Sequence, residues 1–171
     1  MDITGIALSK QMDNRKNLIR YPNGPLSPAA PIVPTYTGFE DQAPTDLENF
    51  TDGNLTTSTG EAKKVLGGSG AGGYFVFDLW SEKNILVTGK MNIGATGGAT
   101  STVFIELALT DGTYISSPSY NAYTAGTYPI LKLLSPFTGT ARYIRLRVGA
   151  SGASTVSASG VELMVYDLGE L

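Results

Sequence analysis

The residue types that most often do chemistry in proteins are scarce in this chain. Its 171 residues include no histidine and no cysteine, which removes the commonest general base, the Ser-His-Asp pairing, thiolate nucleophiles and zinc–cysteine sites. A glycosidase needs two carboxyl groups set across a sugar bond, one of them with a raised pKa. No pattern in the sequence desolvates a carboxyl group in this way, so we expect the protein not to be an enzyme. The carboxylates considered are Asp78, Glu106, Asp111 and Glu162.

Two arginines could bind an anionic ligand. Arg145 and Arg147 alternate with apolar residues and therefore share one face of a strand. A basic stripe of this kind can bind nucleic acid or a sulfated glycan. More often it pairs with carboxylates on the neighbouring strand, and the formal net charge of −3 favours this second interpretation. The same net charge argues against nucleic acid as a partner.

Tyrosines are frequent between residues 114 and 128. Tyrosine side chains on loops can stack on sugar rings or fill pockets of a protein partner, although they can equally cover the edge of a sheet. Trp80 is the only tryptophan, and it ends an aromatic run, so we expect it in the core or at its rim. The candidate contacts for a glycan or a partner are Tyr114, Tyr120, Tyr123, Tyr128, Arg145 and Arg147.

The elements that must position these residues are strands. From about residue 46 onward, apolar and polar residues alternate with a period of two, as in 85–93, 103–109 and 161–165, which indicates strands with one face in a core. Turn signals such as Asp52-Gly53 and Asp111-Gly112 separate the runs. No stretch of about twelve residues has a helical period. The pattern predicts an all-β, antiparallel, jelly-roll-like sandwich of about eight strands over residues 46–171.

Residues 1–45 differ from this body. They hold six of the nine prolines, and because proline lacks an amide donor and fixes φ, we expect an extended N-terminal arm. Apolar residues at intervals, among them Leu18 and Ile32, are more than a disordered linker would carry. We expect much of this arm to pack against another subunit. The alternative is that it packs against the core of its own domain. Its basic start, from Lys10 to Arg20, would lie near an acidic surface.

The ends of the chain carry no membrane signal. No run of about 18 apolar residues is present, and the N-terminus lacks a basic region followed by an apolar stretch. We therefore expect no membrane partner and folding in a cytoplasm.

Six short motifs follow one another along the chain in a recognisable order. They are Asn17-Leu18, Asp52-Gly53-Asn54-Leu55-Thr56-Thr57, Phe75-Val76-Phe77-Asp78-Leu79, Leu109-Thr110-Asp111-Gly112, Ala141-Arg142-Tyr143-Ile144-Arg145 and Glu162-Leu163-Met164-Val165-Tyr166. Their order resembles the discoidin, or coagulation-factor C-type, family of galactose-binding-like β-sandwiches. The chain departs from that family in lacking the tryptophan that usually follows the Asp-Gly-Asn turn, the cysteine pair that often joins the domain ends, and the glycan-contacting histidine of some lectin members.

The resemblance implies a structural calcium ion. In the carbohydrate-binding members of the family, the Asp-Gly-Asn turn and the C-terminal glutamate hold one, which maps onto Asp52, Asn54, Thr57 and Glu162. Calcium takes six to eight oxygen ligands, and a tight turn lets carbonyls and carboxylates converge. Alternatively, Asp52 accepts backbone amides in an ordinary Asp-Gly turn, and Glu162 lies on the solvent face of the last strand.

Two functions remain open. The first is a structural protein of a virus particle, a phage capsid decoration (cement) or appendage subunit located in a virion assembled in the host cytoplasm. A surface rich in small polar residues suits wide contacts, and the arm would join copies of this protein or other virion proteins. The alternative is a carbohydrate-binding module or lectin that recognises a surface glycan. Calcium is the only cofactor expected in either case.

Overall fold

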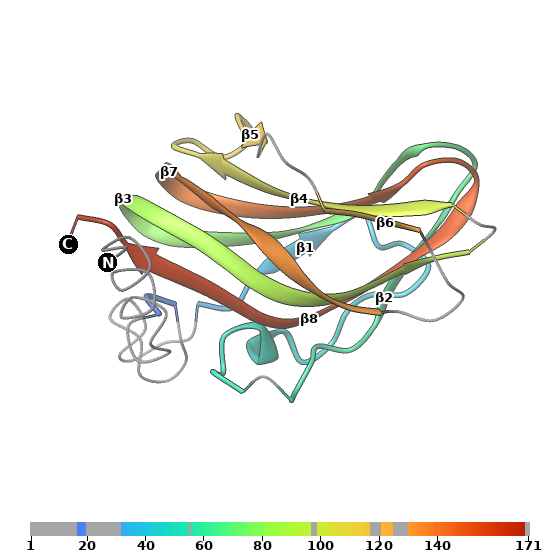
Figure 1. The fold of residues 1–171 in the computed structure, drawn as a ribbon, viewed down its shortest axis with the longest axis horizontal. Helices are drawn as coiled ribbons and strands as arrows, with labels where there is room; N and C mark the ends of the chain where they lie inside the picture. The colour runs from blue at the N-terminus through green and yellow to red at the C-terminus, as the bar shows by residue number, and fades with distance from the viewer. Residues whose placement is uncertain are drawn as a thin grey trace, which may run out of the picture.

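The protein is almost entirely antiparallel β-structure (Figure 1). A computed structural model describes residues 17–19, 32–54, 56–96, 99–116, 121–124 and 130–169. No helix in these ranges is long and apolar enough to cross a membrane. The all-β fold class expected from the sequence is confirmed. The strands are β1 (Thr35–Thr37), β2 (Ala62–Leu66), β3 (Gly70–Ala95), β4 (Thr100–Ala108), β5 (Ile115–Ser116), β6 (Asn121–Thr124), β7 (Ile130–Ala150) and β8 (Ser154–Asp167), with one 3₁₀ helix, η2 (Leu47–Phe50).

Two long strands, β3 and β7, pair with each other through both layers of the sandwich. Gly70 lies opposite Ala150 at one end of this ribbon, and Ile93 lies opposite Ile130 at the other. The register shifts between Asp78 and Lys83, where β3 carries extra residues. An extra stretch on one strand bends it and increases its twist. At this bulge the ribbon passes from one layer to the other (Figure 1).

Each layer is built on one half of that ribbon. In the first layer, β1 pairs with residues 74–76 of β3, and β4 pairs with residues 143–150 of β7. Strands β5 and β6 pair with the other edge of β4. In the second layer, β8 pairs with residues 85–95 of β3 and with β2. The result is the antiparallel sandwich that the alternating pattern predicts.

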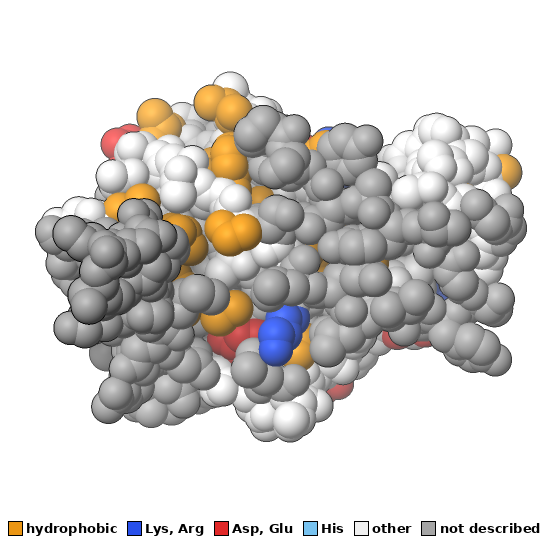
Figure 2. Space-filling model, in the orientation of Figure 1, with side chains coloured by type: hydrophobic (Ala, Val, Ile, Leu, Met, Phe, Trp, Pro, Cys, Tyr) orange, Lys and Arg blue, Asp and Glu red, His pale blue; other side chains and the backbone are white. Residues whose placement is uncertain are grey.

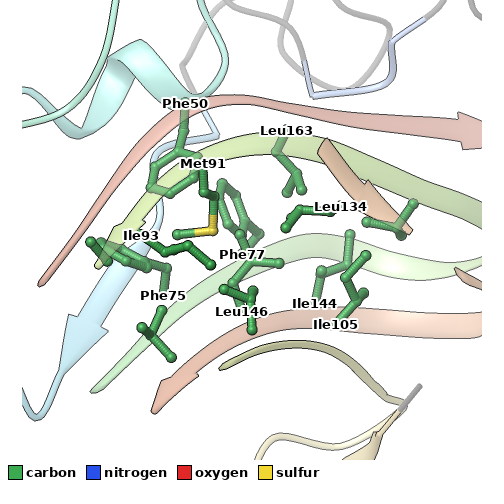
Figure 3. Close-up of a cluster of buried hydrophobic side chains, with 14 of the residues drawn as sticks. Phe50, Phe75, Phe77, Met91, Ile93, Ile105, Leu134, Ile144, Leu146 and Leu163 are labelled. Atoms are coloured by element: carbon green, nitrogen blue, oxygen red, sulfur yellow. The ribbon is translucent and has the colours of Figure 1, made fainter. Parts of the chain in front are cut away.

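The core lies between the two layers (Figure 3). Phe75 and Phe77 point into it from the first layer, and Met91 and Leu163 point into it from the second. The ring of Phe50 at the end of η2 packs edge-on against both phenylalanines, with centroids 5.0 and 5.4 Å away. Along β4, the apolar residues at alternate positions are buried, as the period of two predicts: Val103, Ile105 and Leu107.

The N-terminal segment takes part in this core where it is described. Leu18, Ile19, Ile32 and Phe39 are buried in the same hydrophobic cluster as the strands. These four side chains therefore pack against the core of their own chain, which is the alternative given for this segment in the sequence analysis. Contact with another subunit and the boundary at residue 45 stay predictions. Residues 1–16 and 20–31, with the basic start and most of the prolines, lie outside the described residues.

The described surface carries few charges. On the face shown in Figure 2, the coloured side chains are mostly orange hydrophobic ones, with few red or blue charged ones. This agrees with a chain in which only 16% of residues are charged. Because charged residues are few, we use the places where they cluster to search for a functional site.

Candidate functional site

A hollow of about 260 Å³ lies beside the bend in β3. Asp78 and Trp80 come from the bulge itself, Tyr143 from the partner strand β7, and Asp111 from the turn after β4. The topology thus brings two carboxylates and two aromatic rings to one place. The lining residues are Ile32, Val33, Thr35, Val76, Asp78, Trp80, Asp111 and Tyr143.

Trp80 is the unusual residue of this hollow. Its side chain is 53% exposed, and its φ of 63° lies in the left-handed region, which costs a bulky residue roughly 1–2 kcal/mol. The strand holds it there: Leu79 is fully buried, and the Trp80 amide donates to Asp78 Oδ1 over 2.7 Å. Strained residues that the surrounding fold fixes in place are concentrated at functional sites.

Asp78 is held as an ionised group. Arg142 donates to both of its carboxylate oxygens, Nε to Oδ1 and Nη2 to Oδ2, each over 2.9 Å. This paired geometry is the strong, directional form of a carboxylate–guanidinium contact. The hydrogen bonds from Arg142 hold the pKa of Asp78 below its ordinary value, against the effect of burial. The hollow therefore presents a fixed anionic acceptor at neutral pH.

Tyr114 orients the second carboxylate. Its hydroxyl donates to Asp111 Oδ1 over 2.6 Å, and its ring lies 3.9 Å from the Arg145 guanidinium carbon. Burial raises the pKa of the Tyr114 phenol, and the bond to Asp111 adds to that rise. Tyr114 therefore stays a neutral donor. Its expected contact with a glycan or partner stays a prediction, but the structure places it directly beside the hollow.

The two candidate arginines converge on one buried carboxylate. Arg145 Nε donates to Glu106 Oε2 over 2.5 Å, and Arg147 Nε donates to Oε1 over 2.8 Å. Glu106 is 2% exposed and lies on the neighbouring strand β4. This is the pairing across strands that the sequence favours over a bare basic stripe.

The side chains of three candidate tyrosines are outside the described part of the structure. Tyr120 and Tyr128 lie outside the described residues. The backbone of Tyr123 pairs with Ser101, but its side chain is outside the description. Their role as contacts stays a prediction.

The candidate calcium ligands gather around the turn after η2. Thr57 Oγ1 donates to Asp52 Oδ2 over 2.6 Å and lies 3.1 Å from the Asn54 carbonyl oxygen. Glu162 Oε2 accepts from the Gly53 amide over 3.0 Å. Glu162 is 1% exposed, so the alternative that it lies on the solvent face is wrong.

These residues fit a calcium ion. Among the described residues, no three or more His, Cys, Asp or Glu side chains are placed so that they could hold a metal ion. The Asp52 and Glu162 carboxylates would therefore have to be joined by a hydroxyl and by main-chain carbonyls, a mixture that calcium accepts. The Asn54 amide also donates to Asp52 Oδ1 over 2.7 Å, as in an ordinary Asx turn. Calcium binding stays a prediction. If bound, the ion would stabilise the turn.

Asn17 is a buried polar residue that the candidate residues did not include. Its amide nitrogen donates to the Leu163 carbonyl over 2.8 Å and to Glu162 Oε1 over 3.2 Å, and its oxygen accepts from the Val165 amide over 2.9 Å. It therefore orients Glu162 and completes the edge of β8. The Asn17-Leu18 motif was the feature of the sequence that could have pointed to this residue.

A second hollow of about 390 Å³ is less suited to a polar ligand. None of its lining residues is ionisable, and two of them, Leu109 and Ile115, are exposed apolar side chains. The hollow beside Trp80 is therefore the better candidate for a functional site. The residues around the second hollow are Leu107, Ala108, Leu109, Thr110, Thr113, Ile115, Phe137, Thr138, Gly139 and Thr140.

Sequence comparisons do not place the chain in a family. No protein-family model matches it, and no curated protein matches it.

Comparison of structures finds carbohydrate-binding modules with β-sandwich folds. One is chitosan-binding module 1 from a chitosanase/glucanase of Paenibacillus sp. IK-5, with 19% identity, a TM-score of 0.48, and coverage of 78% of this chain and 92% of that one. A second is the CBM32 of AlyQ in complex with 4,5-unsaturated mannuronic acid, with 23% identity, a TM-score of 0.42, and coverage of 78% and 95%. A third is CBM32-3 from a family 31 glycoside hydrolase of Clostridium perfringens, with 16% identity, a TM-score of 0.44, and coverage of 79% and 89%.

Proposed function

We propose that this protein is a non-catalytic carbohydrate-binding protein whose sugar site is the hollow beside Trp80. The observation that supports this most is the exposed indole of Trp80, fixed by a strained backbone next to an ionised carboxylate. A sugar ring presents apolar C–H groups on its faces and hydroxyl groups at its edge. An amphipathic aromatic ring suits the faces, and a few fixed polar groups in a concave site suit the hydroxyls and give specificity.

Each polar group of the hollow has a definite role in this proposal. Asp78 accepts from sugar hydroxyls while Arg142 keeps it ionised and oriented. Asp111 accepts from a second hydroxyl, and Tyr114 holds it in place. The hydroxyl of Tyr143, from the opposite strand, supplies a group that can both donate and accept.

Binding without hydrolysis agrees with the electrostatics. Glycoside hydrolysis needs a carboxylic acid with a raised pKa to protonate the leaving oxygen. In the hollow, the pKa of Asp78 is shifted in the opposite direction by Arg142. Asp78 is therefore an acceptor for hydrogen bonds and not a general acid.

This proposal takes up the function that the sequence analysis gave as the alternative. A role in a virus particle, with attachment through the N-terminal segment, stays a prediction, since no described feature favours it. We also propose that Asp52, Asn54, Thr57 and Glu162 hold a structural calcium ion that stabilises the turn between η2 and β2.

Binding of the full chain to an array of immobilised glycans tests the proposal. We expect a defined set of glycans to bind, and Trp80→Ala to weaken that binding by at least about tenfold, because a sugar-stacking aromatic ring is an anchor of the site. Leu109→Ala is the matched control, since Leu109 is 50% exposed but lines the other hollow. Binding that survives Trp80→Ala undiminished would contradict the proposal, as would the absence of any bound glycan.

A further inference from the structure

The two arginines that pair with Glu106 continue the surface of the hollow. Tyr143, Arg145 and Arg147 alternate along β7 on the outer face of the first layer, and consecutive members lie about 6.6 Å apart at a rise of about 3.3 Å per residue. Tyr114 connects the two regions, because its hydroxyl holds Asp111 in the hollow and its ring contacts Arg145. The hollow and the arginine pair are therefore neighbouring parts of one face.

Aromatic rings hold the guanidinium groups in place. Arg145 lies over the rings of Tyr114 and Tyr74, at 3.9 and 4.6 Å, and Arg147 lies 4.0 Å over the ring of Phe104. Their Nε atoms are fixed from the other side by Glu106. Because these contacts restrict the side chains before any ligand arrives, a ligand would lose little affinity to their ordering.

The hydrogen-bonding capacity of the two arginines is only partly used. A guanidinium group has five N–H donors, and both arginines bond Glu106 through Nε. Among the described residues, no hydrogen bond is made by the Nη atoms of either. Their side chains are 24% and 27% exposed. Both guanidinium groups therefore keep N–H donors that can bind an anionic group.

We propose that the hollow and the arginine pair form one elongated site for an acidic oligosaccharide. This inference rests on the proposed function: a sugar ring lies against Trp80, and a carboxylate or sulfate group on the adjoining sugar accepts hydrogen bonds from the Nη atoms of Arg145 and Arg147. Guanidinium groups bind such planar or tetrahedral oxyanions through paired, charge-assisted hydrogen bonds.

Three polysaccharides with one backbone test this inference: dextran, carboxymethyl-dextran and dextran sulfate. We expect at least one of the two charged forms to bind the full chain about tenfold or more tightly than dextran. The advantage should fall as salt concentration rises, because screening weakens exposed charge pairs. Whichever charged form binds more tightly identifies the anionic group as carboxylate or sulfate. Charged forms that bind no tighter than dextran would overturn the inference.

Two substitutions, one that removes a positive charge and one that removes a negative charge, distinguish an anion-binding site from an ion-pair network that only supports the fold. Arg147→Gln should lower affinity for the charged form about tenfold and leave affinity for a neutral glycan unchanged. Glu106→Gln removes the competing charge, while its side-chain oxygen can still accept from an arginine Nε and the aromatic rings still hold both guanidinium groups, so it should raise affinity for the charged form. A fall in affinity with both variants would show that the network only supports the fold. Thermal melting of each variant shows whether it is folded, and the salt dependence of the unmodified chain gives an independent readout.

The outcomes also separate this inference from the proposed function. Neutral glycans that bind through Trp80, with no preference for charged forms, would overturn the elongated site alone. Tighter binding of charged forms that Trp80→Ala leaves unchanged would also overturn it, since the arginines would then act without the hollow. If neither neutral nor charged glycans bind, both proposals fail.

Discussion

Trp80 has two features that a residue with only a packing role rarely combines. It exposes half of a large aromatic side chain, and its backbone occupies the left-handed region that favours glycine. A buried Leu79 on one side and the hydrogen bond to Asp78 on the other hold this conformation. The backbone conformation of Trp80 therefore costs conformational free energy, and a role of the exposed indole in binding would explain why it is kept.

A pair of substitutions measures that cost. Trp80→Ala removes the indole but keeps a Cβ at positive φ, whereas Trp80→Gly removes both. We expect the glycine variant to be more stable than the alanine variant by about 1 kcal/mol, since glycine adopts this φ without steric cost. Both variants should lose glycan binding. Chemical denaturation measures the difference, and an alanine variant as stable as the glycine variant would show that the backbone is not strained.

The pairing of Asp78 with Arg142 predicts a pH dependence. Because the folded-state pKa of Asp78 lies below its ordinary value of 3.8, its contribution to stability is complete above that value and is lost as pH falls through the lower, folded-state pKa. Arg142→Gln should return the pKa of Asp78 toward 3.8. Titration of the carboxyl carbon by NMR measures this shift. Lys83→Gln, which breaks the ion pair with Asp167 instead, should leave the Asp78 titration unchanged.

At the residue scale, the family resemblance groups Asp52, Thr57 and Glu162, which do gather at one turn. Sequence reasoning also favours pairing of Arg145 and Arg147 across strands, which the structure shows. It did not include Trp80 among the contact candidates, because a positive φ at a tryptophan leaves no mark in the local sequence. It left open whether Glu162 binds calcium or lies on the solvent face, because alternation along β8 does not show what covers its outer face.

At the scale of elements, alternation predicts the strands but not their continuity. The runs 74–80 and 85–93 look like separate strands, yet both belong to β3, which passes through the bulge without losing its pairing to β7. That bulge creates the hollow by placing Asp78 and Trp80 beside the turn after β4. A bulge depends on long-range pairing, so local patterns do not reveal it. Strand β8 is buried on both faces, which its alternating pattern also does not predict.

The turn between η2 and β2 gives a prediction about metal. If Asp52, Asn54, Thr57 and Glu162 hold calcium, a chelator should lower the melting temperature and added calcium should restore it, since an ion bound only by the folded state stabilises that state. Asp52→Ala should abolish the response to chelator. Asp111→Ala, in a turn outside this cluster, should retain it. A melting temperature that ignores both chelator and calcium would identify the segment as an ordinary Asp-Gly turn.

At the scale of the whole molecule, the N-terminal segment and the last strand depend on each other. Asn17 binds main-chain groups of Leu163 and Val165, and the Leu18 amide donates to the Val165 carbonyl over 2.7 Å. Farther along, β1 adds to the edge of β3. Prolines and intermittent apolar residues were compatible with either an arm on a neighbour or a part of the core. The segment packs within its own chain because Asn17 binds the edge of β8, nearly 150 positions away in the chain.

Truncation tests this interdependence. Deletion of residues 1–40 removes β1 and four core side chains, so we expect the remaining chain not to fold cooperatively. Deletion of residues 1–16 removes none of these contacts and should leave the melting transition in place. Asn17→Ala, in the full chain, should cost about 1–3 kcal/mol because it leaves buried backbone groups without partners. A cooperative thermal transition in the 41–171 fragment would contradict this account.

The whole molecule contains one tryptophan, and it stands at the edge of the proposed sugar site. Tryptophan fluorescence of this protein therefore comes from Trp80 and reports on its surroundings. Titration of the full chain with a glycan that binds on the array is the most direct test of the central claim. We predict a saturable change in the intensity or wavelength of Trp80 emission, with the same dissociation constant as binding measured by calorimetry. Calorimetric binding without any change in Trp80 emission would contradict the claim, because the sugar would then lie elsewhere on the protein.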